Sequence, residues 1–252
     1  DILVSYEHLA MYQKLAQGVA KKLFPSVSLD RFYAKENPDP LIYCHFAEGD
    51  LTDTLYDEIT SFEALGNILN NALKEYNEIN AVMDLVLFID AMKHICRVTR
   101  VINNSGGHAL LVGVGGMGKQ SLSRLSSFVC GYTTVQIQIS QAYTVTSSPG
   151  LKEDIRTMYT KAGLKDEGIC FLFTDAQIAD EKFLVYLNDL LSSGDIPGLF
   201  VADERETVIN AVRSRVKAAG IPETPDNCWR FFIQTVQQNL HMCLCFSPVG
   251  ED

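Results

Sequence analysis

The feature that most constrains the fold of this chain lies over residues 108–130, where an apolar run, a glycine-rich loop and a helical pattern follow one another. The loop, GVGGMGKQS over residues 113–121, matches the form G-x-x-x-x-G-K as far as Lys119. Between a buried strand and a helix, such a loop points successive backbone N–H groups inward and forms a nest for phosphate groups. The alternative interpretation is a glycine-rich turn with an incidental lysine, which the flanking strand and helix patterns disfavour.

After residue 107 the chain alternates between strand and helix patterns. Strands are expected at residues 108–114, 133–139, 168–175 and 241–247, and helices at 118–130, 151–162, 180–193, 202–220 and 226–240. The first strand reads as buried, and Gly131, Gly163 and Gly194 are expected to end three of the helices. Such alternation predicts an α/β protein with a parallel central sheet, right-handed crossovers and helices on both faces. We therefore expect a three-layer sandwich around the loop, preceded by N-terminal helices.

The first hundred residues read as mostly helical. Apolar residues at helical spacing cover residues 5–22 and 61–76, and LIYCHF at residues 41–46 reads as extended. A longer helix is expected over residues 82–102, with a set of apolar side chains facing inward. That set is Val82, Leu85, Val86, Ile89, Met92, Ile95, Cys96 and Ile102.

Charge and composition exclude several classes of protein. The chain has 252 residues and a net charge of −10, and its Lys and Arg residues are scattered, which argues against a nucleic-acid or acidic-membrane surface. No apolar run approaches the ~20 residues of a membrane span. The seven cysteines include no C-x-x-C pair and are expected to be reduced, with Cys243 and Cys245 on one face of a strand. Because the chain does not begin with Met, we expect it to be a piece of a longer protein.

The loop departs from the usual pattern at Gln120, where Ser or Thr normally provides a hydroxyl ligand for Mg²⁺. The Gln120 amide oxygen would have to fold back to reach a metal, and Ser121 lies about 100° further round the helix. The departure leaves phosphate binding in place and weakens the placement of the metal. The residues expected to contact nucleotide phosphates are Gly113, Val114, Gly115, Gly116, Met117, Gly118, Lys119, Gln120 and Ser121, with Gln120 also a candidate metal ligand.

A nucleoside triphosphatase also needs an acidic residue at the end of a later strand, to hold Mg²⁺ and to orient the attacking water. Asp175 ends the apolar run ICFLFT and is the best candidate for this catalytic and metal-binding role. Asp90 lies within a helical pattern, and the pair Asp203-Glu204 fits the start of another helix. Compared with the usual Asp-Glu pair, Thr174 stands in the metal-holding place and Asp175 in the water-orienting place. Both changes are expected to weaken hydrolysis more than binding.

Ser247 ends the last apolar strand, a position where a polar side chain often senses the γ-phosphate or positions water. A Ser-Pro turn is the alternative interpretation. The helix before this strand carries no arginine beyond Arg230, so an arginine finger offered to a neighbouring site is not evident.

Four stretches, in order, resemble the fourth AAA+ module of an axonemal dynein heavy chain. They are MDLVLFIDAMKHICRVTRVI (83–102), GGHALLVGVGGMGKQSLSRLSSFVCGY (106–132), FLFTDAQIADEKFLVYLNDLLSSGDIPGLF (171–200) and LCFSPVGE (244–251). The resemblance runs from about residue 38 to 252 and implies an AAA+ P-loop NTPase fold within a six-module ring. It also implies that residues 1–40 are a helical link from the preceding module. Residues 41–252 would then be the large α/β subdomain, truncated before the small helical subdomain.

The resemblance implies a role for each matching residue. The loop from Gly113 to Gln120 looks like the Walker A loop, and its GKQS form is common in this module. Thr174 and Asp175 look like the end of Walker B, and Ser247 looks like the first sensor. Leu41 and Ile42 lie where the entry loop of the family covers the adenine. Related modules place arginines near Gln237-Gln238, and their absence argues against a contact with a neighbouring module's nucleotide.

These observations predict a module that binds ATP or ADP, with or without Mg²⁺, hydrolyses it weakly or not at all, and regulates the motor ring. The alternatives are a competent ATPase that uses Asp175 as its base, and a structural spacer with an empty or permanently ADP-filled pocket. Expected partners are the neighbouring AAA+ modules, the microtubule through the stalk, and dynein intermediate and light chains. Neither nucleic acid nor membrane is an expected partner. The expected location is the cytoplasm, in the cytoskeleton of the cilium or flagellum axoneme.

Overall fold

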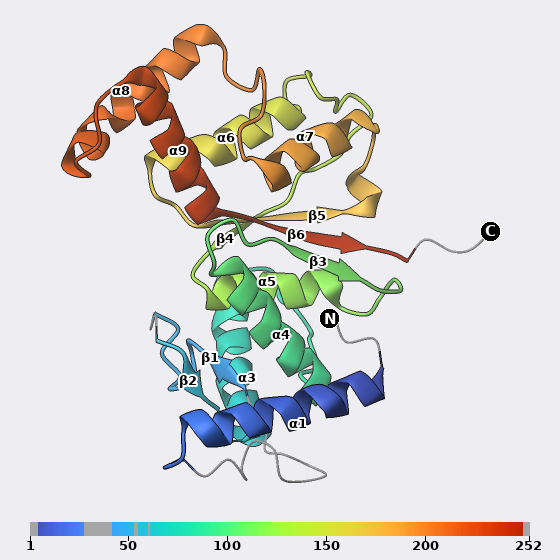
Figure 1. Ribbon diagram of the computed structural model, residues 1–252. Coiled ribbons are helices and arrows are strands. Elements are labelled where there is room, and N and C mark those ends of the chain that lie inside the picture. Colours follow the sequence, from blue (N-terminus) through green and yellow to red (C-terminus); the bar gives the residue numbers. More distant parts are fainter. Residues whose placement is uncertain (1–4, 28–41, 53–54, 60, 249–252) are drawn as a thin grey trace.

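The computed structural model describes residues 5–27, 42–52, 55–59 and 61–248 (Figure 1). In chain order the elements are α1 (Tyr6–Leu23), β1 (Tyr43–Cys44), β2 (Asp57–Glu58), α3 (Phe62–Ile79), α4 (Ile89–Ile102), β3 (Ala109–Val112), α5 (Lys119–Val129), β4 (Thr133–Val135), α6 (Leu151–Leu164), β5 (Ile169–Thr174), the 3₁₀ turn η1 (Asp175–Gln177), α7 (Lys182–Ser192), α8 (Ala202–Ala218), α9 (Pro225–Asn239) and β6 (Leu240–Phe246). None of the helices within these ranges is long and apolar enough to cross a membrane.

A four-stranded sheet forms the middle layer of the molecule. Its order is β3-β6-β5-β4, and each adjacent pair of strands is parallel. Helices α3, α4 and α5 lie on one side of the sheet, and α6, α7, α8 and α9 lie on the other (Figure 1). Because β5 is an inner strand with helices on both faces, all six of its residues are buried. The predicted α/β fold class, a three-layer sandwich with a parallel sheet, is confirmed.

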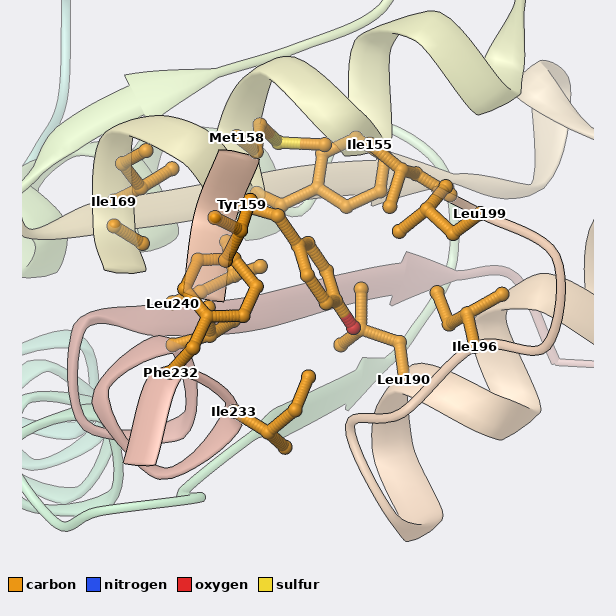
Figure 2. Close-up of a cluster of buried hydrophobic side chains, with 14 of the residues drawn as sticks. Ile155, Met158, Tyr159, Ile169, Leu190, Ile196, Leu199, Phe232, Ile233 and Leu240 are labelled. Carbon is orange, nitrogen blue, oxygen red and sulfur yellow. The ribbon is translucent and has the colours of Figure 1, made fainter. Parts of the chain in front are cut away.

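The larger apolar core fills the space between the sheet and helices α6–α9, where aromatic and aliphatic side chains converge (Figure 2). Tyr159 of α6 is 1% exposed, and its hydroxyl donates a hydrogen bond of 2.8 Å to the Gly194 carbonyl oxygen. That bond lets the ring be buried without leaving an unpaired polar group. A second core joins α3, α4, α5 and β1 on the opposite side of the sheet. A smaller cluster that includes Cys170 of β5, Cys243 of β6 and Ile102 of α4 covers this second face of the sheet, so each face has its own buried layer.

We predicted that helix α6 ends at Gly163, but the helix continues through this residue to Leu164. Gly163 is buried inside the helix and faces α9. A β-carbon built at this position would lie 2.3 Å from Cε2 of Phe232 and 2.8 Å from Cγ2 of Val236. The glycine therefore serves the close approach of two helices, a tertiary requirement that overrides its usual role as a helix terminator.

The Gly163→Ala variant is expected to lose about 1–3 kcal/mol of unfolding free energy, because the added methyl group overlaps the Phe232 ring in a filled core. Urea unfolding of the chain would measure this loss. Gly66→Ala is the matched control, since a β-carbon there meets only Sδ of Met92 at an ordinary 3.5 Å. The control should be neutral or gain up to about 1 kcal/mol. Equal stability of the two variants would contradict the proposed close packing.

The helix predicted over residues 82–102 begins only at Ile89, and residues 82–88 have no regular secondary structure. The side chains of Val82 and Val86 are 82% and 75% exposed rather than facing inward. Met83, in this segment, is held through its backbone: its N–H donates to Asn77 Oδ1 at 2.8 Å, and its carbonyl accepts from Asn77 Nδ2 at 3.2 Å. Alternate residues of the segment are half-buried and exposed, which is the two-residue period of an extended chain.

Several strand predictions were too long, and one was wrong about burial. Strand β3 covers 109–112 of the predicted 108–114, and β5 covers 169–174 of the predicted 168–175. Ladder hydrogen bonds in β4 cover only residues 133–135 of the predicted 133–139, and β1 keeps two residues of the extended run 41–46. Strand β3 lies at the edge of the sheet formed by the described residues, and its Leu110 and Val112 side chains are 60% and 59% exposed. Apolar composition alone does not distinguish an inner strand from an edge strand. The remaining helices match their predicted ranges closely, and Cys243 and Cys245 share a face of β6 as predicted.

Candidate functional site

The glycine-rich loop joins the end of β3 to the start of α5, as its sequence predicts. Gly116 and Gly118 have φ angles of 80° and 74°, in the left-handed region that glycine adopts without strain. A β-carbon built at Gly115 or Gly116 would meet no atom within 4 Å, so the space beside these two glycines is open. This cradle of backbone amides at a helix N-terminus fits an anion such as a phosphate group.

The Lys119 ammonium is held by the loop itself. Its Nζ donates to the carbonyl oxygens of Gly113 at 2.5 Å and Val114 at 2.9 Å. An ammonium group carries three N–H donors, so two of them position the charge and one is left for a ligand. The lysine is therefore pre-positioned beside the open side of the loop.

The loop opens into a hollow of about 460 Å³, which we call the phosphate-loop hollow. It brings together residues from the loop, from α5 and from the ends of β5 and β6. The residues that line it are Gly115, Gly116, Met117, Gly118, Lys119, Gln120, Ser121, Arg124, Asp175, Cys245 and Ser247. Of the predicted site residues, Gly113 and Val114 contribute carbonyl oxygens to Lys119, and Thr174 lies outside this lining.

Asp175 sits at the carboxyl end of β5 and bridges to the end of β6. Its Oδ2 accepts from the Ser247 backbone N–H at 2.8 Å, and its Oδ1 accepts from the Ala176 N–H at 2.9 Å. Hydrogen bonding to Ser247 is the main reason that the pKa of the Asp175 carboxyl lies below its ordinary value. The bond from Ala176 and the positive charge of Lys119 act in the same direction. A carboxylate stabilised in this way is a weaker proton acceptor.

The Thr174 hydroxyl is turned away from the hollow. Thr174 is 5% exposed, and both its backbone N–H and its Oγ1 donate to Gln177 Oε1, at 2.8 Å and 3.2 Å. Gln177 Nε2 in turn donates to the Ile137 carbonyl oxygen at 2.6 Å. Sequence reasoning missed Gln177, although the spacing Thr-x-x-Gln is that of a capping box and was a usable signal.

Arg124 lines the hollow and was also missed by the sequence analysis. It lies on α5 four residues after Gln120, a spacing that places both side chains on the same face of a helix. Its Nη2 donates to Oε1 of Gln136, which directly follows β4. The i, i+4 relation to Gln120 was the signal available in the sequence.

A second hollow of about 660 Å³, the α4–β3 groove, adjoins the loop and shares Met117 and Lys119 with the first. Leu85 and Phe88 are among its lining residues, and Leu85 lies beside the loop, since a β-carbon at Gly118 would lie 3.7 Å from its Cδ1. Ile42, predicted to cover the adenine, lines neither hollow and packs against the core of α3, α4 and α5. Leu41 lies outside the described residues.

The competing acidic residues lie where their helical patterns predicted. Asp90 is in the first turn of α4, with Lys93 Nζ 3.7 Å from its Oδ1. Asp203 and Glu204 are in the first turn of α8, and Glu204 Oε1 accepts from Arg156 Nη1 at 2.9 Å. Among these candidates only Asp175 lines the phosphate-loop hollow.

The site combines a glycine-rich loop, which joins strand β3 of a parallel sheet to helix α5 and carries an inward lysine, with polar residues at the ends of two further strands. This arrangement defines a P-loop protein of the AAA+ class. A comparison with family models identifies the group within this class. Residues 83–252 match the P-loop containing dynein motor region D4, and the chain belongs to that family.

Curated dynein heavy chains are similar to this chain along nearly its whole length. It is 54% identical over 252 residues to the dynein alpha chain, flagellar outer arm, of Chlamydomonas reinhardtii. It is 48% identical over 250 residues to the dynein beta chain, ciliary, of Tripneustes gratilla, and 44% identical over 250 residues to dynein axonemal heavy chain 17 of Homo sapiens. These matches cover 99–100% of the chain but only 5–6% of the length of the relatives.

Proposed function

We propose that this chain is a nucleotide-binding AAA+ module of an axonemal dynein motor, which holds ATP or ADP and hydrolyses it weakly or not at all. In this role the module regulates the motor ring and, through the ring, the stalk. The observation that carries the proposal is a division within the site. The groups proposed to bind phosphate are in place, whereas the Thr174 hydroxyl and both carboxylate oxygens of Asp175 already have hydrogen-bond partners within the protein.

The binding half of the site consists of the open amide cradle and the Lys119 ammonium, which the carbonyl oxygens of Gly113 and Val114 hold in place. Phosphate binding needs only this positive charge and the oriented N–H groups. Catalysis needs more, because charge must be stabilised at the position where it develops in the transition state. The Thr174 hydroxyl is occupied by Gln177, and both oxygens of Asp175 already accept backbone N–H groups.

The base of the nucleotide is expected in the part of the α4–β3 groove next to the loop. Leu85 and Met117 lie at the loop, and Phe88 is another lining residue of the groove; Phe88 and Met117 are 62% and 67% exposed, so they offer apolar surface to an aromatic ring. Ile42 lines neither hollow, and Leu41, which lies outside the described residues, stays a predicted contact of the adenine.

The names of the relatives guide the proposed setting. They describe flagellar outer-arm, ciliary and axonemal dynein chains. We place this module in the cytoskeleton of a cilium or flagellum axoneme. Its proposed partners are the adjacent AAA+ modules of the same heavy chain, the microtubule reached through the stalk, and the intermediate and light chains bound elsewhere on the motor. Residues 1–40 are proposed as the link from the preceding module, and 41–252 as the large subdomain.

A turnover measurement tests the proposal. In the protein at its native length, with the other phosphate loops of the ring disabled, phosphate release is expected to be slow. The Asp175→Asn variant should change its rate by less than about threefold, whereas loss of a working general base costs ~10²–10⁴-fold. Asp203→Asn, which alters an acidic residue outside the hollow, is the matched control. Rapid phosphate release that Asp175→Asn abolishes would instead establish a competent ATPase with Asp175 as its base.

A further inference from the structure

The side chains of the phosphate-loop hollow do not fit a protein-held Mg²⁺ ion. Mg²⁺ requires near-octahedral oxygen ligands and usually binds one or two carboxylates together with phosphate oxygens. The one carboxylate in the lining is Asp175, and each of its oxygens already accepts a backbone N–H. Gln120 provides an amide where a hydroxyl normally binds the metal, and the Thr174 hydroxyl donates to Gln177. Among its described lining residues the hollow therefore offers one carboxylate, and it has no hydroxyl at the loop position that usually binds the metal.

A second cation lies in the same hollow. Arg124 is half-buried on α5, and among the described residues that line the hollow only Lys119 and Arg124 carry positive charge. Side chains on a helix tilt toward its N-terminus, so Arg124 is directed from its position back toward Gln120 and the loop. Four residues of helix span about 6 Å, which the long arginine side chain covers.

Gln136 supports the guanidinium from the opposite side. Its Oε1 accepts from Nη2 of Arg124, which leaves most of the five N–H donors of the group available. A guanidinium remains protonated at any physiological pH and binds phosphate oxygens in a two-pronged geometry. The structure thus presents, in the lining of the phosphate-loop hollow, a second cation that Gln136 positions.

We propose that Arg124 binds the outer phosphates of the nucleotide and supplies the positive charge that Mg²⁺ supplies in other phosphate loops. The site then retains nucleotide in the absence of a divalent cation. This inference rests on the proposed nucleotide-binding function and specifies how the same site is regulated. Occupancy of the module is set by the nucleotide alone and does not follow the concentration of free Mg²⁺.

The test measures the dissociation rate of fluorescently labelled ADP from the protein at its native length, with the other phosphate loops of the ring disabled. The rate is compared in excess Mg²⁺ and in excess EDTA. For the unmodified protein, EDTA is expected to change the rate by less than about threefold. Arg124→Gln is expected to release ADP about tenfold faster or more in EDTA, because a charged hydrogen bond to phosphate is lost. Mg²⁺ should not restore the original rate.

Two further variants separate charge from structure. Arg124→Lys keeps the charge and the fold, and should fall between the unmodified protein and Arg124→Gln in EDTA. Arg213→Gln removes an arginine of α8 whose Nη2 contacts only Asn210 among the hydrogen bonds of the described residues, and should match the unmodified protein.

Three outcomes would overturn the inference. The first is a tenfold acceleration of release from the unmodified protein in EDTA. The second is an Arg124→Gln variant, folded as judged by circular dichroism, that releases ADP at the original rate. The third is an unmodified protein that binds no ADP even with Mg²⁺, which would also contradict the proposed function. The first two leave nucleotide binding intact, so the two proposals fail distinguishably.

Discussion

The Lys119→Ala variant is expected to bind ATP and ADP at least about 100-fold more weakly than the unmodified protein, because it removes a charged donor to the phosphates. The ammonium is already positioned by the Gly113 and Val114 carbonyl oxygens, so nucleotide binding gains its charge without first ordering a flexible side chain. Removing it also leaves those two carbonyls without their donor. The measurement is calorimetric binding to the protein at its native length, with the other phosphate loops of the ring disabled.

The matched control is Lys182→Ala, which removes an exposed lysine at the start of α7, outside both hollows. It should bind nucleotide with unchanged affinity. If Lys119→Ala retains the original affinity for ATP and ADP, the loop does not bind phosphate. The structural-spacer interpretation with an empty pocket would then be preferred.

The Phe232→Ala variant is expected to lose about 3–5 kcal/mol of unfolding free energy, the usual cost of removing a fully buried phenylalanine ring. Phe232 is 0% exposed and lies in the core between α9 and α6 (Figure 2). Its ring meets Phe200 edge-on, with centroids 5.8 Å apart, and Trp229 at 5.4 Å. Truncation leaves a cavity against Gly163, which has no side chain to fill it.

Urea unfolding of the chain followed by tryptophan fluorescence would report this loss directly, because Trp229 is the one tryptophan and touches the deleted ring. Phe24→Ala is the control, since Phe24 is 57% exposed and should change the unfolding free energy by less than about 1 kcal/mol. A loss for Phe232→Ala no greater than that of the control would show that this core is loosely packed.

Local signals in the sequence predicted most elements after residue 107. Gly131 and Gly194 follow α5 and α7 with φ angles of 70° and 69°, because the end of a helix favours the left-handed conformation that glycine adopts freely. Gly163 is also a glycine near the end of a helical pattern, but it is needed for a different reason, since it leaves room for the Phe232 ring. A helix terminator and a helix-packing glycine are alike in sequence and differ only in what lies beside them.

Residues 82–88 illustrate a second limit. Their apolar residues fit a helical pattern when the run is read together with α4. They also fit an extended pattern when read alone, because short apolar runs satisfy both periods. The Asn77 side chain decides between them by bonding both backbone groups of Met83. The burial of β3 was likewise beyond sequence reasoning, because the position of a strand in the sheet order is a property of the whole fold.

Sequence patterns alone were enough to identify the phosphate loop, the lysine within it, Asp175 at the end of β5 and membership of the family. It could do so because a nest of backbone amides is built from consecutive residues, and its geometry is set by glycines at fixed spacing. The assembled fold was needed to show which side chains line the phosphate-loop hollow and which form hydrogen bonds outside it. The Thr174 hydroxyl is bonded by Gln177, whose side chain donates to the carbonyl oxygen of Ile137, 40 residues earlier in the chain. Arg124 donates to Gln136, which lies beyond the connection between α5 and β4. Such partners meet only after the strands are assembled into a sheet.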